Sequence, residues 1–141
     1  MKIRASGEPA LFAAWAVALI ASLSVLFIGE VLGQTPCVLC WYQRAFMFPL
    51  AVILGIAAWR ADFGIRIYAI PLAAIGGGIA LWHLGLYVGL IPEAVQPCSQ
   101  SGPSCTDENQ LFLGVPIPLL SLAAFVAIIF LLMAAQPETD T

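Results

Sequence analysis

The sequence predicts an all-α membrane protein, a four-transmembrane-helix antiparallel bundle with both termini in the cytoplasm. Hydrophobic residues make up 62% of the 141 residues and charged residues only 9%, whereas soluble proteins contain about 25% charged residues. A chain of this length cannot hide so much apolar surface from water in a core of its own, so lipid must replace water. Long apolar runs and the positions of the basic residues then give the number of helices and their orientation.

Four apolar runs are each close to the roughly 20 residues that a helix needs to cross about 30 Å of hydrocarbon. Each run must be helical because a spanning segment has to satisfy its own backbone hydrogen bonds. The runs cover residues 10–32, 41–59, 67–91 and 115–135. Pro49 and Pro71 lie inside the second and third runs, where we expect them to bend the helices without ending them.

The first run follows Lys2 and Arg4 and so has the basic head of a signal peptide. It is longer than the apolar region of a typical signal peptide, and Glu30 interrupts the approach to any cleavage site. We therefore expect a retained helix.

Basic residues set the orientation. They precede the first run or flank the link between the second and third runs: Lys2, Arg4, Arg60 and Arg66. The outer loops, residues 33–40 and 92–114, contain no Lys or Arg. The positive-inside rule therefore places both termini in the cytoplasm and all four cysteines outside, in a compartment where disulfides persist.

The chain is expected to be one domain, residues 1–141, because short links make neighbouring helices antiparallel. The exception is the loop 92–114, and a long irregular connection in a compact protein is usually functional. Gly76, Gly77 and Gly78 in the third run favour close helix packing. A groove beside them for a flat ligand ring is the alternative. The net charge of −3 and the absence of a basic patch give no indication of nucleic-acid binding.

Cys37 and Cys40 form a C-x-x-C pair where the second helix begins. Such a pair can cycle between dithiol and disulfide. The positive end of a helix stabilises a thiolate, which is the attacking species. A structural disulfide or half of a zinc site are the alternatives for this pair alone.

Arg44 follows Cys40 by four residues, so it should lie one helical turn deeper on the same face. An arginine within an apolar run costs about 2.5–3.5 kcal/mol at mid-membrane and less near the interface. A cation there could stabilise a Cys40 thiolate or the negative charge on a reduced quinone. Snorkelling to lipid phosphates is the alternative.

Cys98 and Cys105 form a second pair in the outer loop. Closing so short a loop gives little stability, because even a 15-residue loop gains only about 3 kcal/mol. A disulfide that exchanges easily fits this position better. A structural zinc site usually has two short knuckles, which the second pair does not provide, so no metal site is predicted.

His83 lies about two turns before the outer end of the third run. An ionisable residue inside a membrane helix is a functional candidate, here for carrying a proton to or from a quinone. The alternative is an interhelical hydrogen bond to a serine or a backbone carbonyl. Glu30 could pair with Arg44 or His83, or reach the headgroups.

Taken together, these residues resemble the bacterial disulfide-bond formation protein B (DsbB) family, in particular its short BdbC-like branch. The resemblance is carried by the segment from Gly29 to Arg44, with its P-C-x-L-C-x-x-x-R core, and by Cys105 with the segment from Leu111 to Leu122. It covers essentially the whole chain. The stretch between the last two cysteines is much shorter than in the classical proteobacterial members, so any surface helix carried there is expected to be absent.

The resemblance implies an enzyme of the bacterial cytoplasmic (inner) membrane that re-oxidises an extracytoplasmic, DsbA-like thioredoxin-fold oxidase. The electrons would pass to ubiquinone or menaquinone. By position, Cys98 looks like the residue that forms the mixed disulfide with the partner, and Cys105 like its resolving mate. Cys37 and Cys40 would then take the electrons, with Cys40, Arg44 and, as an approximate match, His83 next to the quinone.

Two other interpretations remain at this stage. One is a relative of the vitamin K epoxide reductases, in which the C-x-x-C pair follows the loop pair, whereas here it comes first. The other is a non-catalytic membrane scaffold with two structural disulfides, which would leave the spacing of Arg44 from Cys40 as coincidence.

Overall fold

The computed structural model describes residues 7–33, 38–90, 111–112 and 114–135. Within these ranges four helices are long and apolar enough to cross a membrane, which confirms the all-α fold class. The elements in chain order are α1 (Glu8–Leu26), η1 (Phe27–Val31, a π-helical turn), α2 (Val38–Arg60), η2 (Phe63–Ile65, a 3₁₀ turn), α3 (Arg66–Tyr87), β1 (Leu111–Phe112), β2 (Val115–Pro116) and α4 (Ile117–Ala134).

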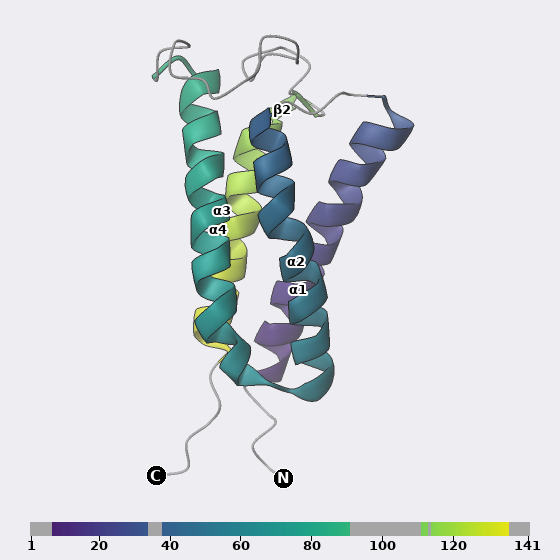
Figure 1. Ribbon diagram of the computed structural model, residues 1–141, viewed down its shortest axis with the longest axis vertical. Helices are drawn as coiled ribbons and strands as arrows, with labels where there is room; N and C mark the ends of the chain where they lie inside the picture. The colour runs from purple at the N-terminus through teal and green to yellow at the C-terminus, as the bar shows by residue number, and fades with distance from the viewer. Residues whose placement is uncertain (1–6, 34–37, 91–110, 113, 136–141) are drawn as a thin grey trace.

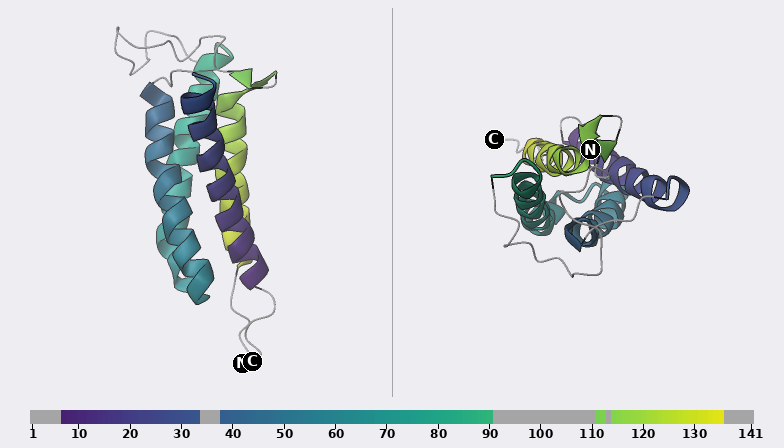
Figure 2. Two further views of the ribbon diagram at one scale, coloured as in Figure 1. Left: turned by 90° about the vertical axis from the view of Figure 1, so that its right-hand side faces the viewer. Right: turned by 90° about the horizontal axis from the view of Figure 1, so that it is seen from above.

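The helices run alternately up and down, and each packs against its neighbours in sequence (Figures 1 and 2). Contacts between α4 and α1 close the ring. The start of α1, the turn η2 and the end of α4 lie together at one end of the bundle, which we call the η2 end. We call the opposite end, where α2 begins and α3 ends, the Cys40 end.

Two predicted boundaries at the Cys40 end were wrong. The loop 33–40 was expected to end with Cys40, but α2 already begins at Val38, so Cys40 belongs to the first helical turn. The third run was expected to remain helical to Ile91, but α3 ends at Tyr87. Gly89 has φ +87°, and Leu90 N–H donates to the Gly85 carbonyl at 2.9 Å. This is a glycine-dependent Schellman cap, which closes the helix.

The fourth run was expected to be helical from Val115, and this too was wrong. Val115 pairs with Phe112 in a two-stranded antiparallel ladder, across a turn in which Gly114 has φ +82°. The helix begins only at Ile117, with Pro118 in its first turn. A proline there is favourable because its missing N–H would have no helical partner.

A close α3–α4 contact explains one of the glycines singled out in the sequence. A Cβ built on Gly76 would lie only 2.4 Å from Cε1 of the buried Phe125. The aromatic ring therefore fills the space that a side chain would need. Packing, rather than a groove for a ligand ring, is the role of Gly76. Gly78 differs, because a Cβ there would meet nothing within 4 Å.

Helix α1 lies against the bundle at its start and leans away from the other helices toward the Cys40 end (Figure 1). The helix continues into η1, where Leu32 N–H donates to the Phe27 carbonyl in the wider π-helical pattern.

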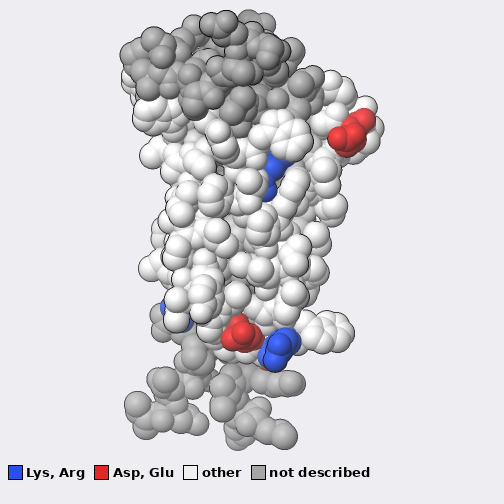
Figure 3. Space-filling view, viewed as in Figure 1, with Lys and Arg blue, Asp and Glu red and all other residues white. Residues whose placement is uncertain are grey.

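The surface of the bundle is suited to lipid. Figure 3 shows a broad belt of uncharged side chains between charged groups near either end. At the η2 end Trp59 is 91% exposed beside the exposed Arg60, and Tyr68 is also exposed. Aromatic side chains of this kind are enriched where a membrane meets water.

Candidate functional site

Cys40 is the third residue of α2 and lies half-buried against α3. It packs onto a small cluster in which Leu39 and Leu86 are buried and Ile79 partly so. The N–H groups in the first turn of a helix create a positive potential that stabilises a nearby thiolate. The position therefore favours the reactive form of the thiol. The other predicted site cysteines, Cys37, Cys98 and Cys105, lie outside the described residues.

His83 and Gln43 form a buried polar pair across the α2–α3 interface. Gln43 Nε2 lies 2.9 Å from His83 Nδ1, and the two side chains are 5% and 0% exposed. Both residues belong to the same interface as Cys40, because His83 lies between Ile79 and Leu86 on α3 and Gln43 follows Cys40 by three residues. The predicted alternative for His83, a bond to serine or a backbone carbonyl, did not name this partner.

Gln43 is the residue that sequence reasoning missed, although the signal was present. It is an amide inside an apolar run, and such a group must face the bundle interior and find a hydrogen-bond partner there.

Arg44 lies on the opposite flank of α2. Its guanidinium donates a hydrogen bond of 3.1 Å to the backbone carbonyl of Val25 on α1, and its Cζ lies 5.1 Å from the ring centroid of Trp41. Arg44 follows Cys40 by one turn of the continuous helix α2, as predicted, but its long side chain reaches α1, whereas Cys40 packs against α3. These contacts hold the cation within the protein rather than at lipid phosphates.

Glu30 lies exposed in η1. Among the described residues it forms no ion pair with Arg44, whose donor goes to the Val25 carbonyl instead. The pairing of Glu30 with Arg44 was therefore wrong. The π-helical turn carries the carboxylate to the outside of the bundle, which fits the third option, contact with headgroups.

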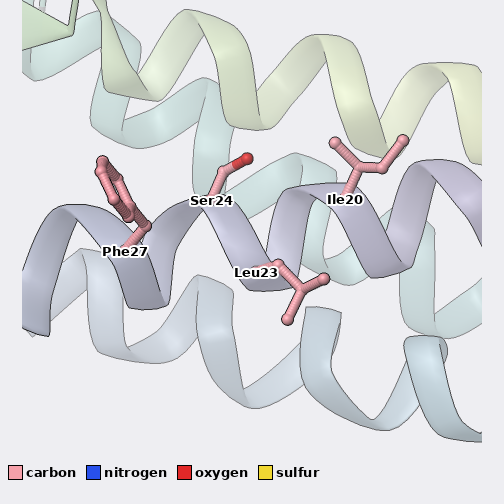
Figure 4. A pocket seen from close by; sticks show the side chains of 4 residues that line it. All are labelled: Ile20, Leu23, Ser24 and Phe27. Atoms are coloured by element: carbon pink, nitrogen blue, oxygen red, sulfur yellow. The ribbon is translucent and has the colours of Figure 1, made fainter. Parts of the chain in front are cut away.

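A groove of about 370 Å³ runs along α1 and η1 where this helix leans away from the bundle. Its lining is apolar except for one hydroxyl: Ile20, Leu23, Ser24 and Phe27 (Figure 4). Ser24 precedes Val25, so the groove adjoins in sequence the carbonyl that holds Arg44. All four lining residues are exposed, so the groove opens to the surroundings of the bundle.

Comparison with known proteins decides the family. The profile of the family "Disulfide bond formation protein DsbB" matches residues 7–135. The chain belongs to the DsbB family. The alternative interpretation, a relative of the vitamin K epoxide reductases, names a different family.

Relatives support the same assignment to the DsbB family. The chain is 56% identical to the "Probable disulfide formation protein" of Metapseudomonas resinovorans, over 89% of this chain and 88% of that protein. It is 41% identical to the protein of the same description from Deinococcus radiodurans, over 86% and 85%. It is 39% identical to "Disulfide bond formation protein C" of Bacillus subtilis, over 91% and 93%. No solved structure matches the chain.

Membership of the DsbB family implies thiol–disulfide oxidoreductase chemistry in disulfide-bond formation, carried by a multi-pass membrane protein. The described geometry adds where the polar groups lie. Cys40, Gln43 and His83 face the α2–α3 interface, whereas Arg44 lies between α2 and α1.

Proposed function

We propose that this chain is a quinone-dependent protein-disulfide oxidoreductase. It re-oxidises a DsbA-like thioredoxin-fold partner outside the cytoplasm and passes the electrons to ubiquinone or menaquinone in the bacterial cytoplasmic membrane. The observation that carries the proposal is the position of Cys40 in the first turn of α2, with His83 on one flank of that helix and Arg44 on the other. The position suits a thiolate that donates electrons at the edge of the hydrocarbon.

The proposed reaction consists of two thiol–disulfide exchanges and one oxidation of a dithiol. The partner dithiol reduces the Cys98–Cys105 disulfide, and that dithiol in turn reduces the Cys37–Cys40 disulfide. The Cys37–Cys40 dithiol then returns to the disulfide and gives up two electrons and two protons. A quinone bound near Cys40 would supply the acceptor for these two electrons and two protons.

The residues present fit a quinone. Its carbonyl oxygens need hydrogen-bond donors, and the guanidinium of Arg44 and the ring of His83 are donors on the two flanks of the cysteine helix. Its hydrocarbon tail needs an apolar surface open to lipid, which the groove along α1 offers. Arg44 holds positive charge in a region of low dielectric, where it stabilises developing negative charge more than it would in water.

The orientation is part of the proposal. The exposed Arg60 lies at the η2 end together with the start of α1, and Lys2 and Arg4 precede α1 in the sequence. Basic residues gather on the cytoplasmic side of membrane proteins. This distribution supports an orientation in which the Cys40 end faces the outer surface, where the partner would work.

The test is turnover with purified components in detergent or bilayer discs. Reduced DsbA-like partner and a soluble quinone are mixed with catalytic amounts of the protein, and quinone absorbance and partner thiols are followed together. We expect one quinone to be consumed for each partner disulfide formed, and Cys40→Ser to abolish it. Disulfides that form and persist without any quinone consumption would instead indicate a non-catalytic scaffold.

A further inference from the structure

The cation of Arg44 is held by two uncharged groups. Its Nη2 donates to the Val25 carbonyl at 3.1 Å, and its Cζ lies over the Trp41 ring, 5.1 Å from the centroid. Within the part of the chain that the structure describes, no carboxylate forms an ion pair with this guanidinium. A carboxylate would cancel the positive charge, whereas a carbonyl dipole and the face of an aromatic ring attract the cation and leave its charge in place.

The spacing of the two side chains along α2 brings the ring within reach of the cation. Trp41 precedes Arg44 by three residues, so the two lie one turn apart on one side of the helix. Helical side chains point back toward the N-terminus of their helix. The long side chain of Arg44 therefore extends toward the Cys40 end, where Trp41 lies. Their separation is within the roughly 6 Å range of a cation–π contact.

The two anchors leave part of the guanidinium accessible. A guanidinium carries five N–H donors, and the hydrogen bond to Val25 uses only Nη2. Arg44 is half-buried, and its nitrogens are not among the enclosed polar atoms that lack a partner, unlike Nε of Arg66. Nε and Nη1 of Arg44 therefore keep accessible surface. The result is a cation that is fixed in position, retains its charge and still has donors to offer.

We propose that Trp41 is a positioning residue for Arg44: its ring fixes the guanidinium near the start of α2 without neutralising it, so that the remaining N–H groups stay available to the quinone. The part played in the quinone step rests on the proposed function; the contact between the two side chains does not. An exposed tryptophan at a membrane surface has another common use, as an interfacial anchor. An anchor, unlike a cation–π partner, does not depend on the electron density of the ring.

The contact is tested first by NMR, without any measurement of activity. The four tryptophans of the chain are labelled with 5-fluorotryptophan, and the ¹⁹F signal of Trp41 is identified by its loss in Trp41→Phe. We expect Arg44→Met to move the Trp41 signal. The signal of Trp59, which is 91% exposed at the other end of the same helix, should stay where it is. An unmoved Trp41 signal would overturn the proposal.

Graded fluorination then separates the electrostatics of the ring from its size. Fluorine atoms withdraw electrons from the indole face and weaken its attraction for a cation, while the shape of the side chain changes little. Tryptophan with one, two or three ring fluorines is incorporated in place of Trp41, and kcat/KM for a soluble quinone is measured. We expect a stepwise decrease that reaches about two- to fivefold, the scale of a partly exposed cation–π contact.

The matched control is the same fluorinated series at Trp59, which should leave kcat/KM for quinone unchanged. Trp41→Phe should retain more activity than Trp41→Leu, because phenylalanine still offers an aromatic face. Thiol exchange with the partner in the absence of quinone should keep its wild-type rate in every variant. Activity that does not respond to fluorination of Trp41, or that responds equally at Trp59, would show an interfacial anchor and overturn the proposal.

Repeating the Trp41 series in the Arg44→Met background connects the ring with the cation. We expect the dependence on fluorine number to disappear there, because the group that the ring attracts is missing. A dependence that persists would show that the ring acts on something other than Arg44. If the wild-type protein reduces no quinone, the proposed function fails, whereas the NMR test of the contact between Trp41 and Arg44 is decided separately.

Discussion

The guanidinium of Arg44 donates a hydrogen bond of 3.1 Å to the main-chain carbonyl of Val25, across the interface between α2 and α1. Val25 lies two residues before the π-helical turn η1. The bond joins Arg44 on α2 to α1, the helix along which the apolar groove runs. Arg44 is thus positioned by α1, not by Cys40.

Arg44 should act in the quinone step and not in the thiol relay. We expect Arg44→Met to lower kcat/KM for quinone about 10- to 100-fold, the scale of a hydrogen bond to a charged group. The loss in Arg44→Lys should be smaller, because lysine keeps the positive charge but lacks the planar guanidinium with its paired N–H donors. The measurement is steady-state kinetics with quinone varied and partner saturating.

The control for Arg44 is disulfide exchange with the partner when no quinone is present. We expect the wild-type exchange rate in both variants. An unchanged quinone KM and turnover in Arg44→Met would show that the residue only joins α2 to α1, through the Val25 carbonyl.

The loop cysteines should divide the exchange with the partner between them. We expect Cys98→Ser to abolish oxidation of the partner, because the attacked sulfur is lost. Cys105→Ser should accumulate a mixed disulfide between Cys98 and the partner, since the resolving thiol is missing. Non-reducing gels with mass spectrometry of the linked peptides identify the adduct. If a mixed disulfide with the partner formed only through Cys105, in the Cys98→Ser variant, Cys105 would be the attacked cysteine and Cys98 the resolving one.

The orientation can be measured by cysteine labelling in intact cells. After reduction, a membrane-impermeant maleimide should label Cys98 and Cys105, whereas a cysteine introduced at the exposed Arg60 in a variant without the other cysteines should remain unlabelled until the cells are opened. Both expectations follow from the basic residues at the η2 end. The opposite labelling pattern would place the termini outside.

The contact of Gly76 with Phe125 predicts a large difference between two neighbouring glycines. Gly76→Ala places a Cβ 2.4 Å from the aromatic ring, and such overpacking should lower the free energy of unfolding by about 1–3 kcal/mol. Gly78→Ala meets nothing within 4 Å, so it should be neutral or slightly stabilising, because alanine is the better helix former. Unfolding in mixed micelles monitored by circular dichroism compares the two. Equal stability of the variants would contradict the close α3–α4 contact.

Much of the fold follows from sequence because the requirement for spanning a membrane acts on one segment at a time. The four runs were predicted from length and apolar content alone, and the structure contains four such helices within the described residues. The ends of the helices were predicted less accurately than their number. The Schellman cap at Gly89 and the Phe112–Val115 pair depend on backbone conformation and on a partner strand, which hydrophobicity does not encode.

The sequence by itself determined that this chain crosses a membrane in four helices, that one C-x-x-C pair begins the second helix, and that the family is DsbB. Only the tertiary structure decided that Cys40 packs toward α3 while Arg44 turns to α1, and that Gln43 is the partner of His83. The physical reason is that apolar content fixes the length of a membrane helix but not its rotation about its own axis. Rotation is set by which neighbour can satisfy each buried polar group, and that neighbour lies far away in the sequence.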